Sequence, residues 1–173
     1  MVRSRETGKR SRRPLAPLRG VLDRLAVHLS PNVRRDPLTG LGNRECLAAE
    51  AARSSSFGLI RIDLEGFGHL DQGRGAETGD LVLVTVARRL SALLDGHCVA
   101  ARLGGDAFAV IVHGGDPTSL AALAARIVAS IERPIHVGRG EVRIGAQLRL
   151  ARAGVGEPIG DVIDRAERMT HRA

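Results

Sequence analysis

Two aspartates in this chain stand where carboxylates are able to hold a metal ion. Asp63 ends an apolar run, and Asp106 follows the pair Gly104-Gly105 between two further apolar runs. A carboxylate at a strand end that faces another on a hairpin suits Mg²⁺, which takes one or two protein carboxylates and completes its octahedron with phosphate oxygens and water. The next residue along, Ala107, can neither take a proton nor coordinate a cation. The two aspartates therefore form a candidate magnesium site.

Other residues around these acids have ordinary structural explanations when each is taken alone. Gly104-Gly105 indicates a tight hairpin, because two-residue turns of the primed types need the positive φ that glycine adopts without steric cost. Asp80 is expected in the first turn of a helix, where a negative charge complements the helix dipole. The six histidines show no clustering typical of a zinc site or a catalytic triad.

Apolar spacing and turn residues predict the elements that position these side chains. Helices are expected at 43–52, about 67–73, about 78–94, from Pro117 after an Asp116 cap, and from about Pro158 with Met169 facing inward. Strands are expected at 57–63, 97–103, 107–112, 134–137 and 141–150. This mixture, with its antiparallel hairpins, predicts an α+β fold in which helices pack on a central, mostly antiparallel sheet.

Four segments together resemble the GGDEF family, the diguanylate cyclases that make cyclic di-GMP from two GTP. The stretch from Arg102 through Gly104, Gly105, Asp106 and Ala107 to Phe108 is similar to R-x-G-G-[DE]-E-F. The other three are 36–44 (D-x-L-T-G-L-x-N-R), 62–68 (similar to D-[IVL]-D-x-F-K) and 79–81 (G-D-x). The first of these is expected to be structural, with Asn43 capping a helix and Asp36 pairing with Arg44. The resemblance covers about residues 36–173 and implies the fold of that family.

The resemblance also implies a role for individual residues. Asp63, the backbone carbonyl of Leu64, and Asp106 would bind Mg²⁺. The turn Gly66-Phe67-Gly68 would cradle phosphates through its amides, as helix N-termini do. Asp71 and Asp80 would recognise guanine.

Several positions depart from the family pattern. Ala107 stands where the family has the glutamate that assists metal binding and activates the attacking hydroxyl, and Gly68 stands where it has a lysine. Asp71 replaces an asparagine, and an ionised aspartate accepts hydrogen bonds but cannot donate them. The inhibitory product site, R-x-x-D, would fall on residues 95–98 and is absent there, and Arg149 replaces a glycine of the late strand motif.

The net charge of +7 comes mostly from the start of the chain, since seven basic residues and one acidic residue lie within residues 1–20. Residues 1–19 are expected to form a disordered basic arm, 20–30 a lead-in helix, and 31–173 the GGDEF-like domain. Such an arm can contact nucleic acid or anionic lipid, but a solvated tail is the favoured interpretation. Two cysteines without metal-type spacing and the absence of a long apolar run favour a cytoplasmic protein.

The sequence therefore predicts a degenerate GGDEF domain, and it leaves three roles open. The domain would be a receptor that binds GTP with Mg²⁺, a scaffold that binds another protein, or a weak cyclase in which Glu65 substitutes for the missing glutamate. An active cyclase would also pair two domains, each presenting one GTP, so a homodimer is among the expected partners.

Overall fold

The structure is a computed structural model that describes residues 34–68, 75–138 and 140–169. The elements follow in the order α2 (Arg44–Ala51), β1 (Phe57–Glu65), α4 (Ala76–Leu93), β2 (Cys98–Gly104), β3 (Ala107–His113), α5 (Pro117–Ile131), β4 (Ile135–Val137), β5 (Gly140–Val142), β6 (Gly145–Arg152) and α6 (Ile159–Arg168). The expected arm, the lead-in helix and most of the expected short helix at 67–73 lie outside the described residues.

The described residues form an antiparallel sheet in the order β2-β3-β1-β6, which places β1 between β3 and β6. In this register Asp63 lies opposite Ala107 on β3 and Gln147 on β6. Arg61 lies opposite Arg149. Because side chains alternate between the two faces of a strand, Arg61 and Asp63 share one face with these partners. The α+β fold with a central antiparallel sheet is confirmed.

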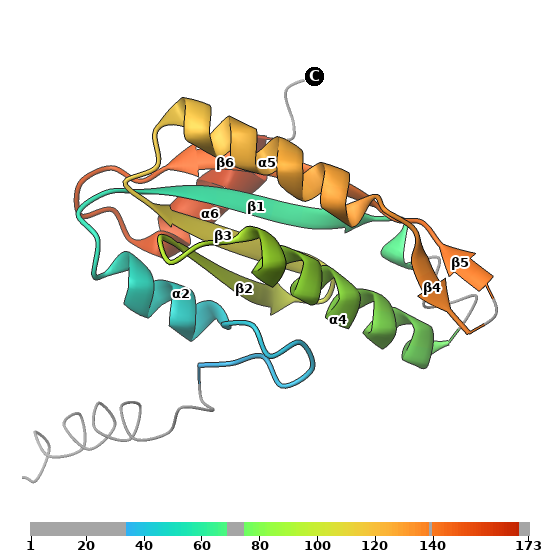
Figure 1. The fold of residues 1–173 in the computed structure, drawn as a ribbon. Helices are drawn as coiled ribbons and strands as arrows, with labels where there is room; N and C mark the ends of the chain where they lie inside the picture. Colours follow the sequence, from blue (N-terminus) through green and yellow to red (C-terminus); the bar gives the residue numbers. More distant parts are fainter. Residues whose placement is uncertain (1–33, 69–74, 139, 170–173) are drawn as a thin grey trace, which may run out of the picture. The chain divides into compact units, whose positions relative to one another are not determined.

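Helices α4 and α5 cover one face of the sheet (Figure 1). The larger hydrophobic cluster lies there and joins Ile60 and Ile62 of β1 to Val86 of α4 and Ile127 of α5. Helix α5 approaches β1 closely at Gly58, where an added Cβ would lie 2.4 Å from the Leu120 Cδ1 atom. The buried residues of helix α5, which include Leu123, Ile127 and Ile131, belong to this cluster.

Helices α2 and α6 cover the other face (Figure 1). A second cluster there joins Leu47 of α2, Leu59 of β1 and Val162 of α6, and all three side chains are fully buried. Helix α2 begins after Asn43, whose side chain accepts a hydrogen bond from the Cys46 amide at 3.0 Å. Near the end of β1 on this face, Asp63 is partly buried.

The structure corrects three details of the expected elements. The single strand expected at 141–150 is two strands, because β5 pairs with β4 whereas β6 crosses to pair with β1. Met169 is 60% exposed rather than facing inward, since helix α6 ends at Arg168. The two-residue loop of the β2–β3 hairpin is Gly105-Asp106, because Gly104 still pairs with Ala107 after a bulge.

No helix within the described residues is both long enough and apolar enough to cross a membrane.

Candidate functional site

The β2–β3 hairpin is held in place by Arg102. Gly104 and Gly105 have φ of +131° and +53°, so both positions require the freedom that glycine provides. The Arg102 guanidinium donates to the Gly105 carbonyl oxygen at 3.0 Å from Nε and 2.7 Å from Nη2. Phe108 is fully buried and anchors the following strand in the larger cluster. The signature residues other than Asp106 thus have structural roles that this geometry explains.

Asp36 ties the 36–44 segment to the same hairpin. Its Oδ1 atom accepts from the Thr39 amide at 2.8 Å and from the Thr39 hydroxyl at 2.6 Å, and Arg102 Nη1 lies 3.4 Å from both carboxylate oxygens. Burial would raise the pKa of Asp36, but these hydrogen bonds and the Arg102 charge outweigh it and hold the pKa below its usual value. The expected pair of Asp36 with Arg44 does not form, because Arg44 donates instead to the Leu103 carbonyl at 3.3 Å.

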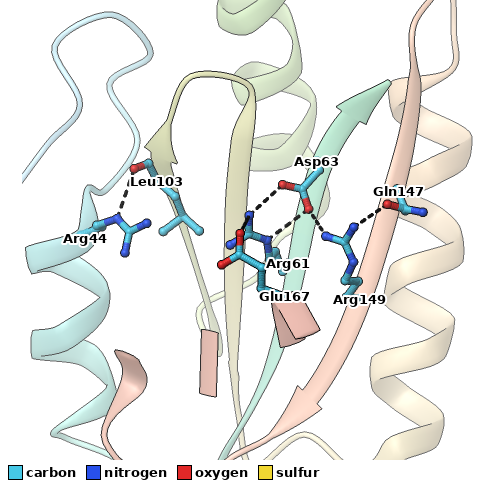
Figure 2. Close-up of polar contacts among 7 residues, drawn as sticks. All are labelled: Arg44, Arg61, Asp63, Leu103, Gln147, Arg149 and Glu167. Carbon is cyan, nitrogen blue, oxygen red and sulfur yellow. Dashed lines mark hydrogen bonds and ion pairs between the residues drawn. The ribbon is translucent and has the colours of Figure 1, made fainter. Parts of the chain in front are cut away.

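Asp63 lies near the end of β1, and both of its carboxylate oxygens are bound by arginines (Figure 2). Arg61 donates to Oδ2 from Nε at 3.1 Å and to Oδ1 from Nη2 at 3.0 Å. Arg149, on β6, donates to Oδ2 from Nη1 at 2.5 Å. The bidentate Arg61 contact is the strongest geometry available to such a pair.

Two further side chains complete this group of charges (Figure 2). Glu167 of helix α6 accepts from Arg61 Nη2 at 3.2 Å, and Gln147 accepts from Arg149 Nη2 at 2.5 Å. We call Arg61, Asp63, Arg149 and Glu167 the arginine–carboxylate cluster. Its two positive and two negative charges cancel, so the cluster carries no spare negative charge that would attract a cation.

The remaining expected metal ligands lie beside Asp63. The Leu64 amide donates to the Asp106 carbonyl oxygen at 3.2 Å, which brings the hairpin turn against the end of β1. Ala107 lies opposite Asp63 and presents only a methyl group. The structure therefore brings the backbones of Asp63, Leu64, Asp106 and Ala107 together.

These residues do not fit a divalent cation. Mg²⁺ requires free oxygen ligands in a near-octahedral arrangement, whereas both oxygens of Asp63 already accept hydrogen bonds from guanidinium groups. A cation at Asp63 would also meet the two positive charges of Arg61 and Arg149. Within the described part of the chain, no group of three or more histidine, cysteine, aspartate or glutamate residues is placed to hold a metal ion.

The expected phosphate and guanine contacts are described only in part. Gly66, with φ of +79°, forms a bend after β1, and Phe67 and Gly68 are helical; Gly66 and Gly68 are exposed. Asp80 is exposed on helix α4, but it lies in the second turn, because the helix begins at Ala76. Asp71 lies outside the described residues.

Residues 95–98, where the inhibitory motif would fall, form a small turn instead. Asp95 Oδ1 accepts from the His97 amide at 3.0 Å, and the Cys98 amide donates to the Asp95 carbonyl oxygen at 3.1 Å. Burial, and then the neighbouring Asp95 carboxylate, raises the pKa of the Cys98 thiol. A raised pKa favours the protonated thiol, which is a weaker nucleophile than the thiolate.

Arg61 and Glu167 are the site residues that sequence reasoning missed, and it noted Arg149 only as a replaced glycine. One local signal was present, because Arg61 and Asp63 are two residues apart on a strand and so share a face. The contact with Arg149 depends on the pairing of β1 with β6, which are more than 80 residues apart, so no local pattern shows it.

The chain is similar to known proteins in sequence and in structure. A family model described as "Diguanylate cyclase, GGDEF domain" matches residues 33–173. The bifunctional diguanylate cyclase/cyclic di-GMP phosphodiesterase MucR of Pseudomonas aeruginosa is 35% identical over 138 residues. That match covers 75% of this chain and 19% of MucR, so the chain spans less than a fifth of that protein's length.

Two solved structures are similar over most of the described residues. The diguanylate cyclase SiaD of Pseudomonas aeruginosa, in complex with its activator SiaC, superposes with a TM-score of 0.76 at 23% identity, covering 88% of this chain and 62% of that one. The coiled coil and GGDEF domain of DgcB from Caulobacter crescentus, in complex with cyclic di-GMP, has a TM-score of 0.73 at 25% identity, covering 89% and 88%.

Proposed function

The chain belongs to the GGDEF family, and from that membership we propose that it is a catalytically impaired regulatory domain of cyclic di-GMP signalling, which acts by binding another protein. The observation that carries this proposal is the arrangement around Asp63. Its carboxylate is bound by two guanidinium groups, and the methyl group of Ala107 lies opposite it.

This arrangement removes two requirements of cyclase chemistry at once. Attack of a ribose hydroxyl on a phosphate needs a group that takes the hydroxyl proton, and the loss of a general base lowers the rate by about 10²–10⁴. Phosphoryl transfer also depends on positive charge that is free to face the phosphates. Here Arg61 and Arg149 are engaged with Asp63, and the cluster as a whole is neutral.

The protein partner rests on a likeness to a relative of the same fold. SiaD was solved in complex with its activator SiaC, so a protein of this fold is able to bind a second protein. We carry that kind of association, though not that partner, over to this chain.

The two competing roles need the same free carboxylates. A GTP receptor would use Asp63, Asp106 and Asp80 with Mg²⁺, and a weak cyclase would use Glu65 in addition. Glu65 is exposed at the last position of β1, but it has the same bound Asp63 two residues before it. Both roles therefore require the arginines to release Asp63.

A direct assay tests the loss of catalysis. The purified chain is incubated with GTP and Mg²⁺ or Mn²⁺, next to the diguanylate cyclase DgcP of Escherichia coli, which is 33% identical over 113 residues. We expect a rate at least about 100-fold below that of DgcP, in line with a missing general base. A comparable rate of cyclic di-GMP formation would show an active cyclase and refute the proposal.

Calorimetric titration separates the nucleotide receptor from the protein-binding domain. We expect no saturable heat with GTP and Mg²⁺ up to millimolar concentrations. Saturable heat at micromolar GTP that is lost in Asp80→Asn would refute the proposal and show that the chain is a GTP receptor.

Complementation tests whether the role in cells is independent of the site. Asp106→Asn removes the carboxylate that any residual metal or cyclase chemistry requires, and the residue lies half-buried in the hairpin turn. The variant should complement a deletion strain as well as the wild-type chain does. Failure of a folded, normally expressed Asp106→Asn chain would indicate that the site itself is used.

A further inference from the structure

The arginine–carboxylate cluster lies where the family resemblance places a cation, and its members come from three elements. Arg61 and Asp63 belong to β1, Arg149 belongs to β6, and Glu167 belongs to helix α6 (Figure 2). The side chains of Arg61 and Arg149 are only 9% and 14% exposed. Such buried cations require a partner, because an unpaired charge away from water is strongly unfavourable.

We propose that Arg61 and Arg149 replace the divalent cation at Asp63, so that this aspartate anchors β1 to β6 and, through Arg61, to helix α6 instead of binding metal. The inference concerns the same site as the proposed function and rests on it in one respect, since a cyclase that turned over GTP would need that cation. It goes beyond it by assigning Asp63 a new, structural role.

Geometry supports the replacement. Both carboxylate oxygens of Asp63 are already engaged, because Arg61 donates to Oδ1 and Oδ2 and Arg149 donates to Oδ2 (Figure 2). The Nε atom of Arg149 is buried and has no hydrogen-bond partner in the part of the chain that the structure describes. This guanidinium is therefore enclosed, and Asp63 is the anionic partner that compensates its charge.

Charge also explains why Ala107 is tolerated. A glutamate at position 107 would face Asp63 across the β1–β3 pair and add a negative charge to a balanced cluster. It would pair with Arg61 or Arg149 before any cation, because these two groups already lie at the site. The methyl group of Ala107 leaves the balance undisturbed.

Binding of Mn²⁺ alone, followed by the electron paramagnetic resonance signal of the free ion, is the first test. Neither the wild-type chain nor the Ala107→Glu variant should lower the signal of free Mn²⁺ at protein concentrations up to about 1 mM. Removing Arg149 in the Ala107→Glu background, as Arg149→Met, should increase the affinity for Mn²⁺ at least 10-fold, because one competing cation is gone. The matched control is Arg152→Met in the same background, which removes an exposed positive charge from the same strand.

Two outcomes of this test would overturn the inference. One is tight Mn²⁺ binding by the wild-type chain that is lost in Asp63→Asn. The other is an equal affinity in the Arg149→Met and Arg152→Met variants once circular dichroism has shown both to be folded. Mn²⁺ binding by a chain that makes no cyclic di-GMP would refute the cation replacement and leave the proposed function intact, so the two failures are distinguishable.

A second measurement does not depend on the arginine variants folding well. In EDTA, Asp63→Asn should lower the urea midpoint clearly, because it leaves Arg61 and Arg149 without a negative partner. The matched change Asp106→Asn should leave the midpoint nearly unchanged, since no ion pair holds that carboxylate among the described residues. If Asp63 were an empty metal ligand, both changes would leave the midpoint equal or raise it, and that result would refute the inference.

Discussion

At the scale of single residues, the neighbours of Asp63 decide its chemistry. An aspartate at this position would bind a metal ion if its oxygens were free, but here they accept hydrogen bonds from Arg61 and Arg149. The sequence predicted Asp63 as a metal ligand, and it noted the replaced glycine at Arg149 without showing that this arginine contacts Asp63. The signature alone suggests that Ala107→Glu would restore activity, whereas the contacts of Asp63 indicate that it would not.

Ala107→Glu on its own should not restore cyclic di-GMP synthesis. The new carboxylate would meet two guanidinium groups, and the domain would still present no free oxygens of Asp63 to a cation. The measurement is product formation from GTP with Mg²⁺, compared with the Ala107→Glu/Arg149→Gly variant. Synthesis by the single variant at a rate close to that of an active cyclase would contradict this prediction.

Asp36 should make stability depend on acid pH. Its pKa is lowered, so the ionised carboxylate contributes stability above its unfolded value of 3.8, and that contribution is lost as the pH falls through the folded pKa. Urea midpoints measured from pH 5 to below pH 3 should fall more steeply for the wild type than for Asp36→Asn. At neutral pH the variant should be less stable by about 1 kcal/mol. The control is Asp164→Asn on the exposed side of helix α6, which should follow the wild-type slope.

At the scale of elements, helix α4 stabilises the end of helix α5 through one side chain. Arg89 donates to the carbonyl oxygens of Ile131 at 2.9 Å, Arg133 at 2.7 Å and Pro134 at 2.7 Å. The last carbonyls of a helix have no partner within it, so Arg89 satisfies the carbonyl of Ile131, the last residue of helix α5, and holds the two following carbonyls beside it.

Arg89→Met should therefore destabilise the domain by about 1–3 kcal/mol, because three carbonyl oxygens, two of them in partly buried contacts, would lose a charged donor. The measurement is the urea midpoint at neutral pH. Arg88→Met removes the same type of side chain from an exposed position on the same helix and should change the midpoint little. Equal losses in the two variants would show that the helix-end contact contributes nothing specific.

Local patterns predicted most elements and missed those set by distant pairing. Asp116 and Pro117 begin helix α5 as expected, and the Asp116 side chain accepts from the Thr118 and Ser119 amides. The break between β5 and β6 was not predictable from residues 141–150, because the alternation of apolar residues continues through Ile144 without interruption. It arises because β6 leaves β4 and β5 to pair with β1, which is a property of the sheet and not of the segment. The cluster around Asp63 was missed for the same reason.

At the scale of the whole molecule, β1 is the strand on which both hydrophobic clusters and the arginine–carboxylate cluster meet. Charges that link β1 to β6 and to helix α6 contribute to the global stability, whereas a cation at the same place would make that stability depend on metal. The two arrangements therefore differ in a quantity that equilibrium unfolding measures without any assay of activity.

The urea midpoint should be the same in EDTA and in 10 mM Mg²⁺, with or without GTP, when NaCl keeps the ionic strength equal. A ligand that binds only the folded state raises the free energy of unfolding by about 2.7 kcal/mol at 100 times its dissociation constant. A site with a dissociation constant of about 100 μM would thus shift the midpoint by about 1 M urea or more. Matching the ionic strength matters, because salt alone screens exposed ion pairs such as that of Glu167, whose side chain is 59% exposed. A rise of that size in the urea midpoint in Mg²⁺ that disappears in Asp63→Asn would show a working metal site. It would refute the proposal that the arginines replace the cation.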